Sequence, residues 1–197
     1  MSGVWYLAFT ILAVVAMGLL VERLYRELFV FEGVRLSDRL HTVLYDWWAG
    51  TYDAGKRKVQ QSDPQVLAGP LVECLERSAV NTPHALVLDL ATGTGRLPAA
   101  LLGDPRFRGR VVGLDISAGM LAKARERLAP FGGRSVLLHQ KAEPLPFPDE
   151  TFDVVSSLES VELLADRDAH FREFLRVLKP GGILLISRNT GVWGRAR

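Results

Sequence analysis

The sequence of 197 residues contains a single cysteine, Cys74. One cysteine forms no intramolecular disulfide, and it excludes a structural zinc site built from several cysteines. The chain also lacks an excess of either charge, because 24 lysines and arginines stand against 22 aspartates and glutamates. This balance gives no reason to expect a nucleic-acid partner. Charged residues make up 23% and hydrophobic residues 48% of the chain, which is typical of a folded rather than a disordered protein.

Charge is absent altogether from Val4–Val21, which is 18 residues long and mostly apolar. As a helix this stretch would be about 27 Å long, close to the ~30 Å hydrocarbon core of a bilayer. A signal peptide is one alternative, since Val14–Ala16 resembles a cleavage site, but no lysine or arginine precedes the stretch as a signal peptide requires. A buried core helix is the other alternative. We expect residues 1–21 to form a transmembrane anchor.

The charges that flank this stretch predict its orientation. Four arginines follow it, namely Arg23, Arg26, Arg35 and Arg39, whereas only the α-amino group precedes it. The positive-inside rule then places the rest of the chain in the cytoplasm. We therefore expect a single-pass membrane protein with a cytoplasmic domain.

Residues 22–84 have the pattern of a helical connector. One face of a predicted helix carries Leu40, Val43, Leu44 and Trp47. The basic run 56–58 fits either a solvated loop or a contact with anionic lipid headgroups. A further helix is expected over residues 64–78, with Gly69–Pro70 marking a break or a second helix start.

Short apolar runs alternate with amphipathic segments through residues 85–197. The expected strands are Ala85–Leu90, Arg110–Asp115, Ser135–His139, Phe152–Ser157 and Ile183–Ser187, and the expected helices are Arg96–Leu102, Ala118–Leu128 and Arg167–Leu178. Ser117 and Asp166 are expected to cap two of these helices. Strands that are apolar throughout are typical of a parallel sheet covered on both faces. We therefore predict an α/β fold with a Rossmann-like, doubly wound, mostly parallel sheet of about five strands.

The segment Val87–Arg96 leads from a buried strand through a turn of small residues into a helix. Gly93 and Gly95 allow the backbone of this turn to approach a ligand closely. Asp115 ends the next strand, where its carboxylate can accept hydrogen bonds from both hydroxyls of a ribose. A dinucleotide fingerprint would need a third glycine at Pro98, and the Gly-Lys-Ser/Thr sequence of a P-loop is absent.

Asp89 narrows the choice of ligand for this turn. A carboxylate beside the turn disfavours pyrophosphate, which prefers backbone amides and positive charge. It suits a ligand with an ammonium or a sulfonium group, and S-adenosylmethionine carries both. The residues therefore point to S-adenosylmethionine rather than to NAD or ATP.

Four motifs follow one another in the order Val87–Gly95, Val112–Ser117, Ala142–Phe147 leading into Phe152–Val155, and Leu178–Gly182. Together they resemble the motifs of class I S-adenosylmethionine-dependent methyltransferases of the methyltransferase-11 type, which include the ubiquinone/menaquinone biosynthesis C-methyltransferases. Tyr45–Asp53 is similar to the lid sequence that closes over the cofactor in this family. The resemblance extends from about residue 41 to residue 188, and in its first motif Ala91 stands where the family often has glycine.

The resemblance implies a set of cofactor contacts. Asp89 and the glycine turn would face the methionine part, Asp115 would hold the ribose, and Ile116 and Met120 would flank the adenine. Lys141 replaces an acid that often reads the adenine amino group, and a lysine cannot accept a hydrogen bond, which leaves that contact to the backbone at Ala142. The expected cofactor-binding residues are Tyr52, Asp89, Ala91, Thr92, Gly93, Gly95, Asp115, Ile116, Met120, Ala142 and Glu143.

Two carboxylates are the expected catalytic residues. Glu159 and Glu162 follow the fourth predicted strand, where the family places residues that face the substrate. Either would accept a proton if the methyl acceptor must lose one, and a solvated helix start is the alternative for both. No histidines and carboxylates have the spacing of a metal site, so we expect no metal.

The function implied by the resemblance is methyl transfer from S-adenosylmethionine to a small acceptor, with a lipid-like or quinone-like acceptor favoured by the expected anchor. Only ten residues follow Ser187, so the C-terminal strands usual in the family are expected to be missing. This keeps open a catalytically inert module that binds the cofactor or a partner. A nucleotide-dependent oxidoreductase is a third alternative, against which Asp89 and Pro98 argue. The sequence predicts no oligomeric state.

Overall fold

The computed structural model describes residues 2–25, 38–78, 84–161, 164 and 166–187. The chain divides into two compact units. One consists of Met1–Arg35 with Asn189–Arg197, and the other is Leu36–Arg188. The predicted boundary between residues 84 and 85 marks where the strand–helix alternation begins, and it stays a prediction.

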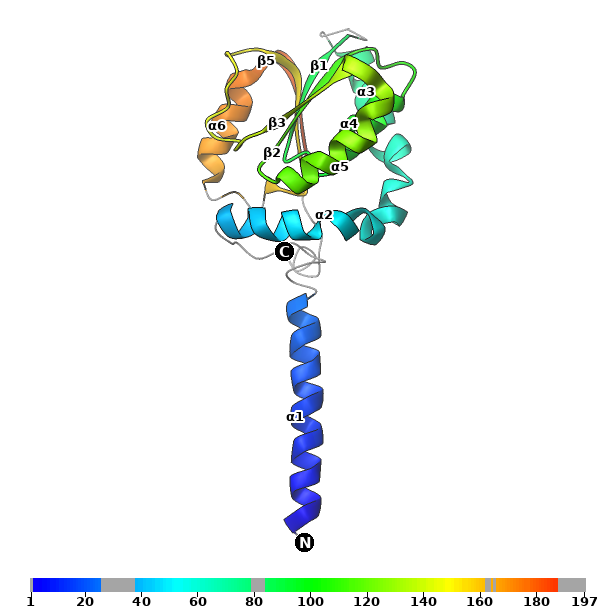
Figure 1. The fold of residues 1–197 in the computed structure, drawn as a ribbon. Helices are drawn as coiled ribbons and strands as arrows, with labels where there is room; N and C mark the ends of the chain where they lie inside the picture. Colours follow the sequence, from blue (N-terminus) through cyan, green and yellow to red (C-terminus); the bar gives the residue numbers. More distant parts are fainter. Residues whose placement is uncertain (1, 26–37, 79–83, 162–163, 165, 188–197) are drawn as a thin grey trace. The chain divides into compact units, whose positions relative to one another are not determined.

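The described part of the first unit is one helix, α1 (Ser2–Tyr25), drawn in blue in Figure 1. Over the residues that the structure describes, no helix combines the length and the apolar content needed to cross a membrane. The predicted anchor is therefore not supported by the structure. Within the predicted span, the structure does not describe the side chains of Val4, Leu7 and Ala8.

The second unit is built on a sheet of five strands in the order β3-β2-β1-β4-β5. Every neighbouring pair is parallel. The strands are β1 (Leu86–Leu90), β2 (Arg110–Asp115), β3 (Ser135–His139), β4 (Phe152–Leu158) and β5 (Leu178–Ser187). This is the order of a doubly wound sheet, with the switch point between β1 and β4. The predicted α/β fold and its parallel sheet are confirmed.

Both faces of the sheet are covered, because alternate residues of each strand point to opposite sides. On one side, Val87, Val111 and Val154 pack with apolar residues of α3 (Gly69–Arg77), α4 (Arg96–Gly103) and α5 (Ala118–Leu128). On the other side, Leu88 and Val155 pack with the apolar face of α6 (Arg167–Val177). Figure 1 shows α6 on one side of the strands and the other three helices opposite. Each large buried side chain contributes roughly 1.5–3 kcal/mol, so these two clusters hold the sheet between its helices.

The two helix caps predicted from the sequence are confirmed. The Ser117 hydroxyl accepts a hydrogen bond from the Met120 amide, and the Asp166 carboxylate accepts one from the Ala169 amide. The expected helix over residues 64–78 changes type at the predicted place, where the π-helix η2 (Pro64–Ala68) ends and α3 begins at Gly69 with the backbone still helical. A short 3-10 helix, η3 (Ala129–Arg134), joins α5 to β3.

The last strand differs from its prediction. It begins at Leu178, directly after α6, because Leu178 pairs with Phe152 before the chain turns. Pairing resumes between Ile183 and Val154 after an irregularity that includes Gly181, whose φ of 75° lies in the left-handed region that glycine tolerates. Residues 180–182, which lie between the predicted helix Arg167–Leu178 and the predicted strand Ile183–Ser187, are therefore an irregular stretch within β5.

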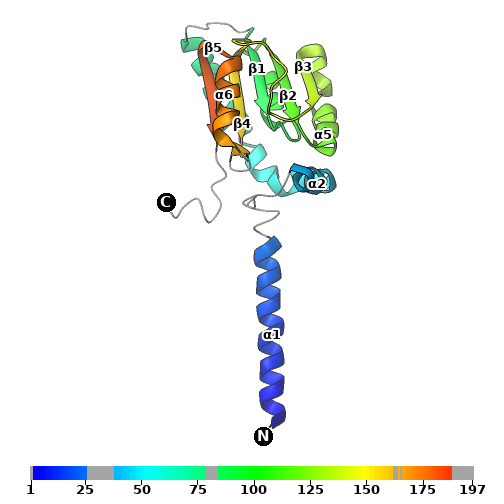
Figure 2. The same ribbon diagram turned by 90° about the vertical axis from the view of Figure 1, so that its left-hand side faces the viewer.

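The helix α2 (Asp38–Gln60) lies across the ends of the strands, below the sheet in Figures 1 and 2. It contacts α5 extensively. The basic run 56–58 continues this helix, so the alternative of a loop is wrong there. In doubly wound sheets, ligands bind outside the carboxyl ends of the strands beside the switch point, and this is the edge that α2 covers.

Candidate functional site

Backbone hydrogen bonds join the glycine turn to the end of β2. The Gly93 amide donates to Asp115 Oδ2 at 2.8 Å, and the Ser117 amide donates to Asp115 Oδ1 at 2.9 Å. Below them, the Thr92 amide donates to the Leu114 carbonyl at 3.0 Å. Burial raises the pKa of Asp115, although the amides that donate to it oppose this shift. The structure thus places Asp115, Thr92 and Gly93 together, as the sequence predicts.

Asp89 is buried inside β1, directly beneath the turn, with only 3% of its surface exposed. Its Oδ2 accepts a hydrogen bond from the Thr92 hydroxyl at 2.7 Å, and its Oδ1 accepts one from the Ser156 hydroxyl at 2.7 Å. Burial raises the pKa of Asp89 to about 6, and the nearby Asp115 carboxylate adds to this rise while the two hydroxyls oppose it. A positively charged ligand would offset the cost of burying these carboxylates.

The backbone of the turn leaves room for such a ligand. Ala91, Gly93 and Gly95 have φ values of 51°, 54° and 77°. A Cβ atom on Gly95 would lie 3.2 Å from the Cβ of Ala124, so glycine is needed there for close packing of α5. A Cβ atom on Gly93 would meet nothing within 4 Å. Open space next to Asp115, with carboxylates beneath it, fits S-adenosylmethionine, whose ribose and positive charges need such groups.

Ile116 follows β2 directly, and Met120 lies in the first turn of α5. The Met120 side chain is buried, and its amide donates to the Ser117 hydroxyl at 3.0 Å. The Ile116 carbonyl lies 2.9 Å from His139 Nε2 at the end of β3. Both residues therefore follow Asp115 closely in the chain, and their contact with an adenine stays a prediction.

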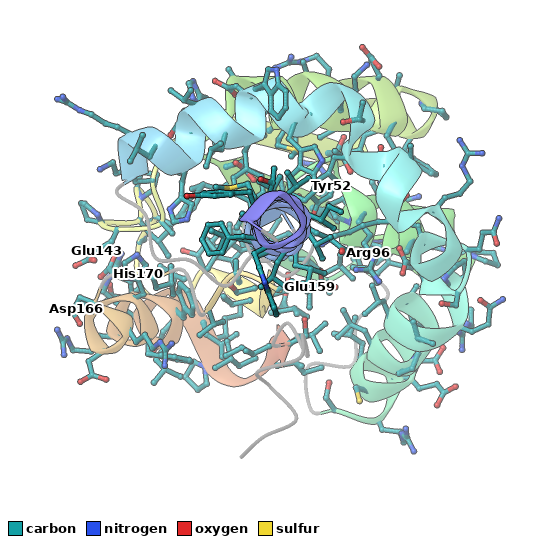
Figure 3. All side chains as sticks on the ribbon, turned by 90° about the horizontal axis from the view of Figure 1, so that it is seen from below. Tyr52, Arg96, Glu143, Glu159, Asp166 and His170 are labelled. Atoms are coloured by element: carbon teal, nitrogen blue, oxygen red, sulfur yellow. The ribbon has the colours of Figure 1, made fainter. Side chains whose placement is uncertain are left out.

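The third motif lies against α6. Ala142 packs with the buried cluster that includes Leu145 and Phe152. Glu143 Oε2 is 3.3 Å from His170 Nδ1, which is itself 2.6 Å from the Asp166 carbonyl. Figure 3 shows Glu143, His170 and Asp166 as one group, apart from Tyr52, Arg96 and Glu159. The Glu143 side chain is thus tied to α6.

Asp46 fastens α2 to the start of α5, a contact that sequence reasoning missed. Its Oδ1 accepts hydrogen bonds from the Ser117 hydroxyl at 2.5 Å and from the Gly119 amide at 2.8 Å. A Cβ atom on Gly119 would lie 3.0 Å from the Asp46 backbone, so the absence of a side chain at Gly119 permits this approach. Asp46 therefore shares Ser117 with Asp115, the predicted ribose-binding carboxylate.

Asp53, two helical turns further along α2, fastens the same helix to the glycine turn. Its Oδ1 accepts a hydrogen bond from the Thr94 hydroxyl at 2.8 Å, and its Oδ2 pairs with Arg127 of α5 at 2.7 Å. The spacing of seven residues between Asp46 and Asp53 is the signal that was available in the sequence, because it places both on one side of a helix.

Tyr52 lies on α2 between the contacts of Asp46 and Asp53 and the end of β4. Its ring meets Trp48 edge-on, with ring centres 4.9 Å apart, and Lys56 Nζ lies 4.8 Å from its centre. Tyr45 lies 6.4 Å from the same ring. The predicted lid aromatics thus form one row on α2, with the exception of Trp47, which is 75% exposed.

A cluster of four charged side chains, the ion-pair cluster (Lys56, Asp63, Arg96 and Glu159), lies at the ends of β1 and β4. Arg96 holds buried Asp63 through two hydrogen bonds of 2.7 Å and Glu159 through one of 2.9 Å. Lys56 donates to the other Glu159 oxygen at 2.7 Å. Figure 3 shows Tyr52, Arg96 and Glu159 near the middle of the view. The cluster joins α2 to α4 and to the end of β4.

The two predicted catalytic carboxylates stay predictions. Burial favours a higher pKa for Glu159, but the charges and hydrogen bonds of Lys56 and Arg96 outweigh it and lower the pKa. Glu159 is therefore ionised at neutral pH and is a weak proton acceptor. Glu162 lies outside the described residues. Among the residues that the structure describes, no group of three or more histidine, cysteine, aspartate or glutamate side chains could hold a metal ion.

Comparison with known families gives this geometry a context. The sequence model of a family described as a methyltransferase domain matches residues 88–186, which is half of the chain. The chain belongs to the methyltransferase-11 family. The predicted assignment to the class I S-adenosylmethionine-dependent methyltransferases is confirmed, and membership of this family supports S-adenosylmethionine as the cofactor.

Curated relatives share this part of the chain. The ubiquinone/menaquinone biosynthesis C-methyltransferase UbiE of Geobacter sulfurreducens is 40% identical over 102 residues, which cover 51% of this chain and 40% of that protein. UbiE of Shewanella sediminis is 44% identical over 114 residues, covering 55% of this chain and 44% of that protein. The chain thus spans less than half the length of these relatives.

Solved structures share the fold. The [4+2]-cyclase SpnF superposes with a TM-score of 0.62 at 22% identity, over 78% of this chain and 60% of that one. The YcgJ protein of Bacillus subtilis superposes with a TM-score of 0.51 at 28% identity, over 60% of this chain and 48% of that one. At 22% identity, the likeness to the cyclase shows the fold alone.

Proposed function

We propose that the chain transfers a methyl group from S-adenosylmethionine to a ring carbon of a quinol-like acceptor. The observation that carries this proposal is the 40–44% identity to UbiE proteins over the cofactor-binding half of the chain. The arrangement of Asp89, Asp115 and the open Gly93 turn supports it, because it suits a cationic nucleotide-like ligand.

The roles of the residues follow from their positions. When bound, the cofactor supplies an electrophilic methyl group on a sulfonium. Asp115 would accept hydrogen bonds from the ribose, and Asp89 would favour the positive charge from beneath the turn. Tyr52 and the ion-pair cluster lie at the other end of the edge, beside the switch point, where the acceptor would enter. Methyl transfer is an in-line displacement that depends chiefly on such positioning and electrostatics.

A turnover assay tests the proposal. The full chain would be incubated with S-adenosylmethionine labelled in the methyl group and a reduced demethylated quinone in vesicles. We expect label in the quinone fraction, and roughly tenfold less label with Asp115→Ala when the cofactor concentration is kept below its dissociation constant. Cofactor binding without labelled product from quinones, membrane extracts or soluble metabolites would instead favour the inert module.

We further propose that α1 anchors the protein to a membrane with the catalytic unit in the cytoplasm. The support is the uncharged Val4–Val21 sequence and the arginines after it. The full chain should remain with membranes after carbonate extraction, and a variant without residues 1–21 should not. Recovery of a secreted protein shortened near residue 16 would contradict this topology.

A further inference from the structure

One face of α2 is exposed and apolar. Leu40, Val43 and Trp47 are 54%, 65% and 75% exposed, and they follow one another at spacings of three and four residues. Gly50 and Ala54 continue the same side of the helix and are also exposed. At about 100° per residue, these five positions lie within an arc of roughly 80°, and we call them the outer face of α2.

The opposite side of α2 faces the rest of the unit. His41 and Ala49 are buried, and Asp53 and Lys56 bond to the glycine turn and to the end of β4. Helix α2 is therefore packed on the unit through its inner side, which contacts the candidate site. Its outer face remains exposed although the helix is packed.

Basic residues border the outer face. Arg39 and Arg57 are exposed and lie five helical turns apart, so they flank the apolar residues at the two ends of α2. The one acid beside this arc is Asp46, whose carboxylate turns away to accept from Ser117 and Gly119. Apolar side chains that include a tryptophan, bordered by arginines, are the features of helices that lie in the interface of an anionic membrane.

Other exposed apolar residues of the unit lack this pattern. Val66, Val136 and Leu175 are exposed to a similar degree, but they come from η2, β3 and α6 and stand singly. Isolated apolar residues are normal on protein surfaces, whereas a row at helical spacing marks an interaction surface.

We propose that the outer face of α2 docks onto the anionic surface of a lipid bilayer. This inference rests in part on the proposed function, because docking would turn the strand ends, with the proposed acceptor entrance, toward membrane-borne acceptors. It requires no membrane span by α1. The bilayer is the occupant favoured by the charge pattern, and a second copy of the chain is the alternative that the experiment detects.

Spin-label accessibility tests the docking without any measurement of turnover. In a Cys74→Ser background of the full chain, a nitroxide label is placed at Val43→Cys on the outer face. Leu175→Cys is the matched control, since it replaces an exposed apolar residue on α6. The natural Cys74, which is exposed on α3, provides a second control. Each protein is mixed with vesicles of phosphatidylcholine alone or with 30% phosphatidylglycerol.

With the anionic vesicles, we expect the label at residue 43 to lose at least half of its collisions with a water-soluble nickel complex and to gain collisions with oxygen. The two control labels should keep their contact with nickel. Sedimentation with the vesicles while residue 43 stays as accessible to nickel as residue 175 would overturn docking and leave the proposed function standing. Protein that stays off the vesicles altogether would overturn both docking and the anchor. Spin–spin broadening at residue 43 without lipid would assign the face to a second copy instead.

Discussion

Helix α2 covers the carboxyl edge of the sheet, and the two parts of this edge, at the end of β2 and at the end of β4, are stabilised in different ways. At the end where β2 stops, Asp115 is fixed by two backbone amides, that of Ser117, two residues further along the chain, and that of Gly93, in the turn after the neighbouring strand β1. At the β4 end, Arg96 and Glu159 are fixed by other side chains. Backbone amides keep their positions whichever side chains surround them, whereas a cluster of side chains depends on every one of its members. The first end is therefore a property of the fold, and the second is a property of this sequence.

The largest expected effect lies at the β4 end. Arg96→Met leaves the carboxylate of Asp63, which is 5% exposed, without its guanidinium partner. Breaking a buried pair of this kind should lower the free energy of unfolding by about 3 kcal/mol. Urea denaturation of the unliganded protein measures this loss.

Arg127→Met is the matched control for Arg96→Met, because its partner Asp53 is 37% exposed. We expect it to cost about 1 kcal/mol or less. Equal losses for the two variants would mean that burial of the partner carboxylate does not distinguish the two ends.

Asp89→Asn should stabilise the unliganded protein above pH 6. The folded pKa is about 6 and the ordinary value is 3.8, so between these values the folded state keeps a proton that the unfolded state has lost. The wild type therefore loses stability as the pH rises through this window, and asparagine does not. A shift of about two units corresponds to roughly 2–3 kcal/mol at pH 7.5.

Urea unfolding of both proteins at pH 4, 5, 6 and 7.5 measures this difference. The stabilisation should be small at pH 4, grow through pH 6 and then stay constant. A gain that is the same at every pH would show that Asp89 does not bind this proton. The variant should also bind S-adenosylmethionine more weakly, because it lacks the buried negative charge.

Asp115→Ala should weaken S-adenosylmethionine binding roughly tenfold or more, since losing a buried acceptor typically costs about 1–3 kcal/mol. Titration calorimetry of wild type and variant measures the two dissociation constants. Equal affinities would remove Asp115 from the cofactor site.

Glu159→Gln is expected to have the smallest effect on cofactor binding, less than about threefold, because partly exposed ion pairs contribute about 1 kcal/mol or less. Its turnover tells the two possible roles apart. A fall of roughly 100-fold or more would identify Glu159 as the proton acceptor despite its lowered pKa. A smaller fall would show that it positions Lys56 and Arg96.

Local sequence patterns predicted the first end well. The apolar strands, the cap at Ser117 and the turn at Gly93–Gly95 all depend on residues within a few positions of one another. The position of Asp115 at the end of its strand then places it beside the turn, because parallel strands carry their carboxyl ends to one edge.

The second end could not be predicted in this way. Lys56 and Glu159 are 103 positions apart, and Arg96 and Asp63 are 33 apart. No local pattern relates these charges, and only the packing of α2 and η2 against the sheet brings them together. Glu159 was singled out because it follows a strand, but its two cationic partners had no signal of their own.

Helix α2 reaches both ends of the edge, through Asp46 to Ser117 and through Lys56 to Glu159. A helix is stiff over such a length, so movement at one end is transmitted to the other. In kinetic terms, exchange of the cofactor and exchange of the proposed acceptor would then not be independent events. An acceptor bound at the proposed entrance beside β4 would slow the departure of the cofactor and favour an ordered sequence of binding and release.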